Sequence, residues 1–146
     1  MRRYVIYLLD REVAKNYIGK EKMLYQLFYE AENKISPYQS VVKKQIDYIT
    51  REIPLNQLHQ AFLSELKHVL KSYEPEKSYE IQMDERMSRA VLIANRKHLS
   101  IYAYGSFDSE ASFFETLRKM DSTFLAIDFK NYHYGWLNPL KRMELA

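Results

Sequence analysis

The sequence contains no cysteine and only three glycines among its 146 residues. The absence of cysteine excludes disulfides, thiolate nucleophiles and cysteine-ligated zinc, and it fits a reducing compartment, so we expect a cytoplasmic protein. The glycines, Gly19, Gly105 and Gly135, are too far apart to build a phosphate-binding loop. Stability must come from an apolar core, and a chain of this length can build one as a single domain spanning residues 1–146.

The sequence is also poor in features that carry chemistry or cross membranes. No two of its histidines (His59, His68, His98 and His133) have the i,i+4 spacing of a helical metal site with a carboxylate nearby. We therefore predict no metal, no cofactor and no catalytic residue. The N-terminal apolar run ends at Asp10, too early for a signal peptide or a membrane span.

Charge is present but weakly biased, with a net charge of +3 and a pI of about 8.9. Basic residues come as scattered pairs, at Arg2 and Arg3, Lys43 and Lys44, Arg118 and Lys119, and Lys141 and Arg142. No continuous basic tract is available to follow a phosphate backbone. We therefore expect no direct contact with nucleic acid.

Tyrosine is unusually frequent, with 13 in the chain. Tyrosine suits half-buried positions and interface hot spots, so this count favours a recognition surface. The alternative is a tyrosine-rich, weakly basic nucleic-acid-binding module, in which Tyr102 and Tyr104 stack on bases beside Arg96 and Lys97.

Helical patterns dominate the first half of the chain. The run "RRYVIYLL" is apolar on both faces and predicts an internal strand. Asp10 as N-cap and Gly19 at C′ bracket a short helix, and a second helix starts near Lys20. "SPYQ", with Ser36 as N-cap and Pro37 as first residue, predicts a third helix. Its main apolar stripe is Val42, Ile46, Ile49 and Ile53, and its flanking stripe is Val41, Gln45 and Tyr48. Residues 55–71 repeat the amphipathic pattern.

Beyond a loop at 73–78 the periodicity becomes alternating. We predict two or three antiparallel strands within 78–105, a helix capped by Asp108 or Ser109, a last buried strand at 124–129, and a tail that turns at Gly135 and Pro139. The turn at 105–110 is either an anion site at a helix N-terminus or a plain cap. The expected fold is α/β (α+β), a mixed sheet of about five strands packed with helices.

Five segments together resemble one family: "YLLDREVAKNYIGKE", "KKQIDYIT", "FFETLRK", "FLAIDF" and "YGWLNP". In this order they resemble the SirA family of sporulation inhibitors of replication. The resemblance implies a small α/β adaptor of endospore-forming bacteria that is made at entry into sporulation. It implies binding to the N-terminal domain of the replication initiator DnaA, a block to new rounds of chromosome replication, and no catalysis. We expect a monomer.

The family's binding surface maps onto the short helix after the first strand and onto the helix containing "KKQIDYIT". Matched residue by residue, the resemblance places partner contacts at Val13, Tyr17 and Gln45. Val13 and Tyr17 share one stripe of their helix, and Ala14 and Ile18 share the next. We therefore expect Ala14 and Ile18 to pack inward while Val13 and Tyr17 stay at the rim for the partner.

One position departs from the family pattern. A phenylalanine stands there where this chain has Val13. The smaller side chain buries less apolar area, a difference on the order of 1 to 2 kcal/mol.

Overall fold

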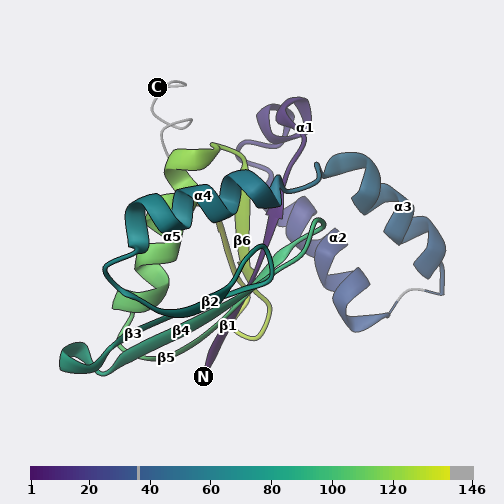
Figure 1. The fold of residues 1–146 in the computed structure, drawn as a ribbon. Coiled ribbons are helices and arrows are strands. Elements are labelled where there is room, and N and C mark those ends of the chain that lie inside the picture. The colour runs from purple at the N-terminus through teal and green to yellow at the C-terminus, as the bar shows by residue number, and fades with distance from the viewer. Residues whose placement is uncertain (36, 139–146) are drawn as a thin grey trace.

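A computed structural model describes residues 1–35 and 37–138 of the chain (Figure 1). Its helices are α1 (Arg11–Asn16), α2 (Glu21–Asn33), α3 (Gln39–Ile49), α4 (Leu55–Leu66) and α5 (Asp108–Met120). Its strands are β1 (Arg2–Leu8), β2 (Leu70–Glu74), β3 (Ser78–Met83), β4 (Ser88–Ala94), β5 (Leu99–Gly105), β6 (Phe124–Asp128) and β7 (His133–Trp136), with a 3-10 turn at Asp84–Arg86.

The strands form one sheet in the order β2-β3-β4-β5-β1-β6-β7, and every pairing in it is antiparallel. The predicted α+β class is confirmed. The sheet differs from the expectation in having seven strands rather than about five, and in being antiparallel rather than mixed. Three strands lie within 78–105, as the alternating pattern predicts.

Strand β1 is an internal strand of this sheet, between β5 and β6, and carries buried residues on both faces, as its sequence predicts. Ile6 and Leu8 belong to a core cluster on the face that α4 and α5 cover, together with Phe62 and Phe113. On the other face, the ring of Tyr7 stacks on Phe28 of α2 at a centroid distance of 4.0 Å. One strand thus links both halves of the apolar core.

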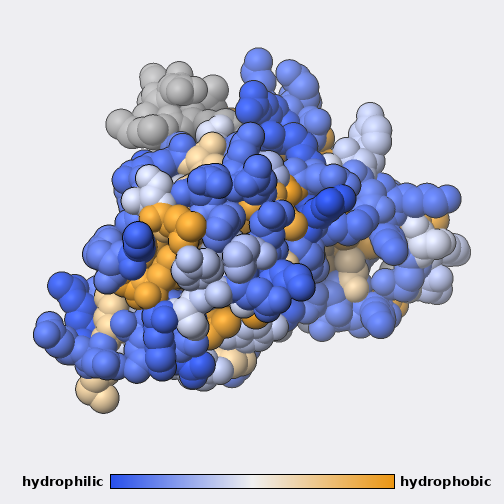
Figure 2. All heavy atoms as spheres, in the orientation of Figure 1, coloured by the Kyte–Doolittle hydropathy of each residue, from blue (hydrophilic) through white to orange (hydrophobic). Residues whose placement is uncertain are grey.

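The second core cluster lies between α2 and the β1–β6 part of the sheet. Its buried members are Leu9, Ala14, Leu24, Tyr25, Phe28, Leu125 and Ile127. Helices α1 and α3 add partly buried residues to the edge of this cluster. In Figure 1, α1 and α3 lie on the side of the molecule away from the β2–β3 hairpin. On the face drawn in Figure 2, hydrophobic side chains reach the surface only in separate patches among hydrophilic ones.

Two predicted helix ends need correction. Helix α3 begins at Gln39, with Tyr38 at N-cap and no capping hydrogen bond from that side chain, rather than at Pro37. The predicted cap Ser36 and the predicted turn at Pro139 lie outside the described residues. Gly19 has the left-handed φ of +86°, but α1 ends at Asn16 with Tyr17 as C-cap, which puts Gly19 one residue beyond C′.

Two edge strands were not predicted. Helix α4 ends at Leu66, so the tail of the predicted 55–71 helix and part of the 73–78 loop instead form β2. Strand β2 is mostly exposed and pairs with β3 through a bulge. Strand β7 follows β6, which is therefore not the last strand. Both edge strands form because their backbones hydrogen-bond to a neighbouring strand. A pattern of apolar residues does not predict such pairing.

Gly105 tests how tightly the end of β5 is constrained. Its φ is +74°, and a Cβ placed there would lie 1.7 Å from the carbonyl oxygen of Met87. We expect Gly105→Ala to lower the free energy of unfolding by at least about 2 kcal/mol, because the strained φ and the backbone clash add. Gly135→Ala is the matched control, since a Cβ placed at that position has open space around it. Urea unfolding of both variants checks this, and equal losses of stability would contradict it.

Candidate partner-binding surface

Helix α1 begins after a side-chain N-cap, Asp10. The Oδ1 atom of Asp10 accepts hydrogen bonds from the amides of Glu12 (3.0 Å) and Val13 (3.2 Å), which confirms the predicted N-cap. Ala14 is the one side chain within this helix that is fully buried. A helix of six residues is too short to be stable alone. Its position therefore depends on the chain around it.

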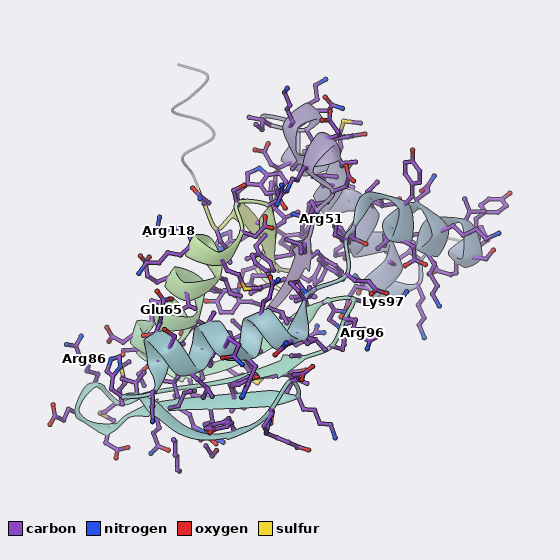
Figure 3. The ribbon with its side chains drawn as sticks, turned by 45° about the horizontal axis from the view of Figure 1, so that its top comes forward. Arg51, Glu65, Arg86, Arg96, Lys97 and Arg118 are labelled. Carbon is purple, nitrogen blue, oxygen red and sulfur yellow. The ribbon has the colours of Figure 1, made fainter. Side chains whose placement is uncertain are left out.

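Arg51 fixes that position. Its Nε donates to the carbonyl oxygen of Leu9 (3.1 Å), and its Nη2 donates to both carboxylate oxygens of Asp121 (3.0 and 3.1 Å) and to Thr123 Oγ1 (2.7 Å). Figure 3 shows Arg51 at the base of α1. One guanidinium thus joins the end of β1, the residue after α5 and the start of β6.

Backbone hydrogen bonds reinforce this junction. The amide of Asp10 donates to the carbonyl of Ile49 at 2.7 Å, and the amide of Arg51 donates to the carbonyl of Leu8 at 2.7 Å. Leu9 also forms a β-bridge with Thr50. The C-terminal end of α3 is consequently held directly beside the start of α1.

The electrostatics of the junction favour the charged pair. Burial raises the pKa of Asp121, but hydrogen bonds from the Thr123 amide and the Arg51 guanidinium outweigh burial and hold this pKa below its ordinary value of 3.8. The carboxylate is therefore ionised at neutral pH and available to Arg51.

Val13 and Tyr17 lie where α1 meets the second core cluster. Both are partly buried and pack against that cluster at its edge, as do Ile46 and Ile49 of α3. Part of each side chain remains exposed to solvent. Ala14 packs inward, as expected.

The expectation for Ile18 is wrong. Its side chain is only partly buried and belongs to neither core cluster; it lines a surface groove instead. The reason is that α1 ends at Asn16, so the chain has left the helical path before it reaches Ile18. Spacing in the sequence extends the helix about two residues too far.

Helix α3 presents two faces. Val42 is buried, and Ile46 and Ile49 pack on the second cluster, which confirms the predicted main stripe up to Ile49. Ile53 is not part of this stripe, because α3 ends at Ile49 and Ile53 is buried in the first cluster. Gln45 is exposed on a neighbouring stripe. The apolar residues of that stripe are also exposed: Tyr38 by 69%, Val41 by 49% and Tyr48 by 84%.

This stripe is a continuous surface, because residues 38, 41, 45 and 48 are spaced by three or four positions. Gln45 lies one helical turn before Ile49, the residue whose carbonyl accepts from Asp10. On the other side of the helix, Asp47 pairs with Lys97 in the β4–β5 turn at 3.1 Å. We use the name α1–α3 surface for two sets of residues taken together: Val13 and Tyr17 at α1, and the exposed stripe of Tyr38, Val41, Gln45 and Tyr48 along α3. The two helices meet where the Asp10 amide donates to the Ile49 carbonyl. The sequence analysis did not assign Tyr38 or Tyr48 to a site. Their spacing of three or four residues from Val41 and Gln45 could have placed them on the same side of the helix.

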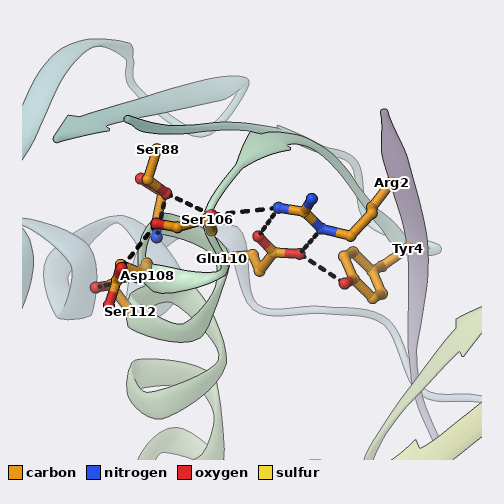
Figure 4. A network of polar contacts seen from close by, with 8 residues as sticks. Arg2, Tyr4, Ser88, Ser106, Asp108, Glu110 and Ser112 are labelled. Carbon is orange, nitrogen blue, oxygen red and sulfur yellow. Dashed lines mark hydrogen bonds and ion pairs between the residues drawn. The ribbon is translucent and has the colours of Figure 1, made fainter. Parts of the chain in front are cut away.

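The turn at 105–110 contains a saturated polar network (Figure 4). Glu110 is only 1% exposed; it accepts from Arg2 Nε (2.9 Å) and Nη2 (2.8 Å) and from the Tyr4 hydroxyl (2.6 Å). Ser88 Oγ accepts from the amide of Ser109 at 2.9 Å. The Ser109 amide at the helix N-terminus is thus bonded to one of the protein's own hydroxyls, which favours the cap over the anion site, and Glu110 joins α5 to β1.

The predicted cap of α5 also needs correction. Phe107 occupies the N-cap position, and Asp108 is the first helical residue. The carboxylate of Asp108 accepts instead from Ser106 Oγ (2.7 Å) and from Arg86 (3.1 Å). The Ser109 amide is capped by the hydroxyl of Ser88 in β4. Because Ser88 is distant in the sequence, a local sequence pattern cannot predict this contact.

The residues of the nucleic-acid alternative are not brought together. Arg96 and Lys97 lie in the β4–β5 turn (Figure 3), whereas Tyr104 lies about 17 Å along β5 from its first residue. Lys97 is paired with Asp47, and Tyr104 has the guanidinium of Arg89 over its ring at 5.7 Å. Tyr102 is half-buried. This arrangement does not place the two basic residues beside the two rings.

Other candidate features of the described chain have structural partners. Asp128 is buried and accepts hydrogen bonds from the amide (3.2 Å) and side chain (2.8 Å) of Asn131, which shapes the β6–β7 turn. Within residues 1–35 and 37–138, no three histidine or acidic side chains gather as metal ligands. In the same part of the chain, no helix has the length and apolar character needed to cross a bilayer.

Similarity to known proteins extends over almost the whole chain. Residues 2–141 match the model of the family described as sporulation inhibitor of replication protein SirA. A curated relative, the sporulation inhibitor of replication protein SirA of Bacillus subtilis (strain 168), is 34% identical over 148 residues. That alignment covers 99% of each chain. The similarity therefore extends over α1, α3 and the strands of the sheet.

The Arg51 junction generates a prediction about acid stability. The pKa of Asp121 is lower in the folded than in the unfolded chain, so its contribution is complete above the unfolded value and is lost as the pH falls through the folded value. We expect Arg51→Met to lower the free energy of unfolding by about 1–3 kcal/mol at neutral pH. We also expect the variant to lose less further stability than the unmodified protein between about pH 5 and about pH 2.

Chemical denaturation at several pH values measures both effects. Arg96→Met is the matched control, because Arg96 is exposed in the β4–β5 turn. Parallel pH profiles for the unmodified protein and Arg51→Met would contradict the assignment of this pKa shift to the Arg51 pair.

Proposed function

This chain belongs to the SirA family of sporulation inhibitors of replication, and from that premise we propose that it inhibits the initiation of chromosome replication at entry into sporulation by binding DnaA. The N-terminal domain of DnaA is the proposed target. The protein acts as a cytoplasmic monomer that occupies its target stoichiometrically, without cofactor and without catalysis.

The α1–α3 surface is the observation that carries this proposal. It combines partly buried apolar residues on α1 with an exposed, tyrosine-containing stripe on α3, and the Arg51 junction holds the two helices together. Tyrosine is enriched at protein interfaces because its ring buries a large area at a small entropic cost. Exposed or partly exposed side chains of this kind on both helices support the proposal of a binding interface.

Each residue named from the family pattern receives a role. Val13 and Tyr17 are apolar anchors, already ordered on one side by the core cluster, so little conformational entropy is lost when a partner covers the other side. Gln45 supplies an exposed amide that both donates and accepts hydrogen bonds. Val41 and Tyr48 extend the contact along α3.

A calorimetric titration with the purified N-terminal domain of DnaA tests the proposal. We expect saturable binding at one inhibitor per domain, and inhibition of replication initiation in vitro that follows complex formation. Tyr17→Ala should weaken binding by about 2 kcal/mol or more, the loss typical of an interface hot spot. Gln45→Ala should weaken binding without a change in stability, because its side chain is exposed.

Two controls separate binding from folding. Gln57→Ala makes the same change at an exposed position of α4, on the opposite face of the sheet, and should bind normally. Leu24→Ala removes a buried side chain of the second cluster and should cost about 2–5 kcal/mol of stability. Normal binding by both Tyr17→Ala and Gln45→Ala, or inhibition complete far below one inhibitor per initiator, would overturn the proposal.

Val13 offers a gain-of-function prediction. The position is at the edge of the core cluster and partly exposed, so a larger side chain has room toward the partner. Val13→Phe should tighten binding by about 1–2 kcal/mol, roughly ten-fold in Kd, because more apolar area is buried. Comparison of Kd for both proteins at equal salt checks this. Unchanged binding by Val13→Phe would place Val13 outside the contact, and weaker binding would show that the partner leaves no room for the larger ring; either result contradicts the prediction.

A further inference from the structure

A groove lies on the side of α1 that faces α5. It has a volume of about 640 Å³ and runs between α1 and the C-terminal end of α5. Its charged lining consists of Arg11, Glu12, Lys15, Arg118, Lys119 and Asp121. Ile18 adds an apolar contact to the wall. Figure 3 shows Arg118 on α5. No residue assigned above to partner binding lies in this groove.

Helix α1 is a ridge between the groove and the α1–α3 surface. Arg11 and Lys15 are four positions apart and share one side of the helix, while Val13 and Tyr17 share another. Ala14, which is buried, lies between these two sides and fixes which way each one faces. A partner that covers α1 therefore meets apolar residues on one flank and cations on the other.

The groove carries an excess of positive charge. Four cations and two carboxylates line it, and one of the carboxylates, Asp121, is already held by Arg51 at 3.0 Å. Arg11 lies 3.8 Å from Asp121 and its side chain is 75% exposed. Among the described residues, Lys15 forms no ion pair within 4 Å.

In the described part of the chain, neither cation of α5 has an acidic partner inside the groove. Arg118 forms a bidentate pair with Glu115 on its own helix, through Nε and Nη2, and Lys119 lies 3.5 Å from Glu65 of α4, so both acidic partners lie outside the groove lining. Both pairs are at least partly exposed to solvent, which limits their strength. Arg118 and Lys119 therefore remain available to another carboxylate.

We propose that this groove receives an acidic segment of the same protein that binds the α1–α3 surface. The inference rests on the proposed function and assigns to the N-terminal domain of DnaA a carboxylate-bearing segment that docks beside α1. An interface of standard size covers about 800 Å² on each partner, whereas α1 is only about 9 Å long, so a partner seated on α1 extends onto its flanks. The cations then attract that partner before contact.

Association kinetics with the purified N-terminal domain of DnaA test the inference. Lys15→Gln combined with Arg118→Gln should lower the association rate at low salt by at least about three-fold and reduce its dependence on salt, with a much smaller change in the dissociation rate. Glutamine keeps both helices intact while it removes the charges. The matched control is Lys71→Gln combined with Lys77→Gln at the β2–β3 hairpin, which changes the net charge equally and should leave the rates unchanged.

The outcomes separate this inference from the proposed function. The groove proposal would be contradicted if the groove variant, the hairpin variant and the unmodified protein all associated at the same rate. If Tyr17→Ala still weakened binding in that case, the proposed function would stand. An equal loss of association rate in both charge variants would assign the effect to net charge and would also contradict the groove proposal. Binding of a short DNA duplex that is lost in the groove variant alone would reassign the groove from an acidic protein segment to nucleic acid.

Discussion

The placement of α1 depends on one ionic hydrogen-bond junction, centred on Arg51. This residue follows α3 and reaches the carbonyl of Leu9, the carboxylate of Asp121 and the hydroxyl of Thr123, which belong to segments far apart in the sequence. Hydrogen bonds to charged groups are stronger than neutral ones, and each partner here would be costly to leave unpaired. Because α1 has only one buried side chain of its own, its angle to α3 is set at this junction rather than by its own packing.

The junction is effective because the sheet beneath it is rigid. Strand β1 is buried on both faces and bonded to β5 and β6, so Leu9 and Asp10 emerge from a fixed edge. On one face α4 and α5 close the larger cluster, and on the other α2 closes the smaller one. Residues at the margin of the smaller cluster, among them Val13 and Tyr17, are ordered on one side only, which leaves apolar surface preorganised for a partner.

Sequence reasoning recovered the elements whose signal is local and strong. Two-sided burial of β1, the Asp10 cap, the main stripe of α3 as far as Ile49 and the alternation after residue 78 all have a short-range physical cause, and each appears in the structure. The edge strands β2 and β7 escaped because backbone pairing rather than an apolar face defines them. The Arg51–Asp121 pair escaped because 70 positions separate its members, and no periodicity reports such a contact.

The same distinction applies to the candidate site. Spacing alone put Val13 and Tyr17 on one stripe. It also predicted that Ile18 packs inward with Ala14, which is wrong because α1 ends at Asn16 and Ile18 lines the groove. Once α1 is read as a ridge, its two flanks have separable physical effects. In the complex that we propose, apolar contact at Val13 and Tyr17 would act at short range and govern how slowly the complex dissociates. The cations of the groove would act over about 8–10 Å in physiological salt and govern how fast it forms. A helix of six residues would then influence both rates, with Arg51 holding it in place.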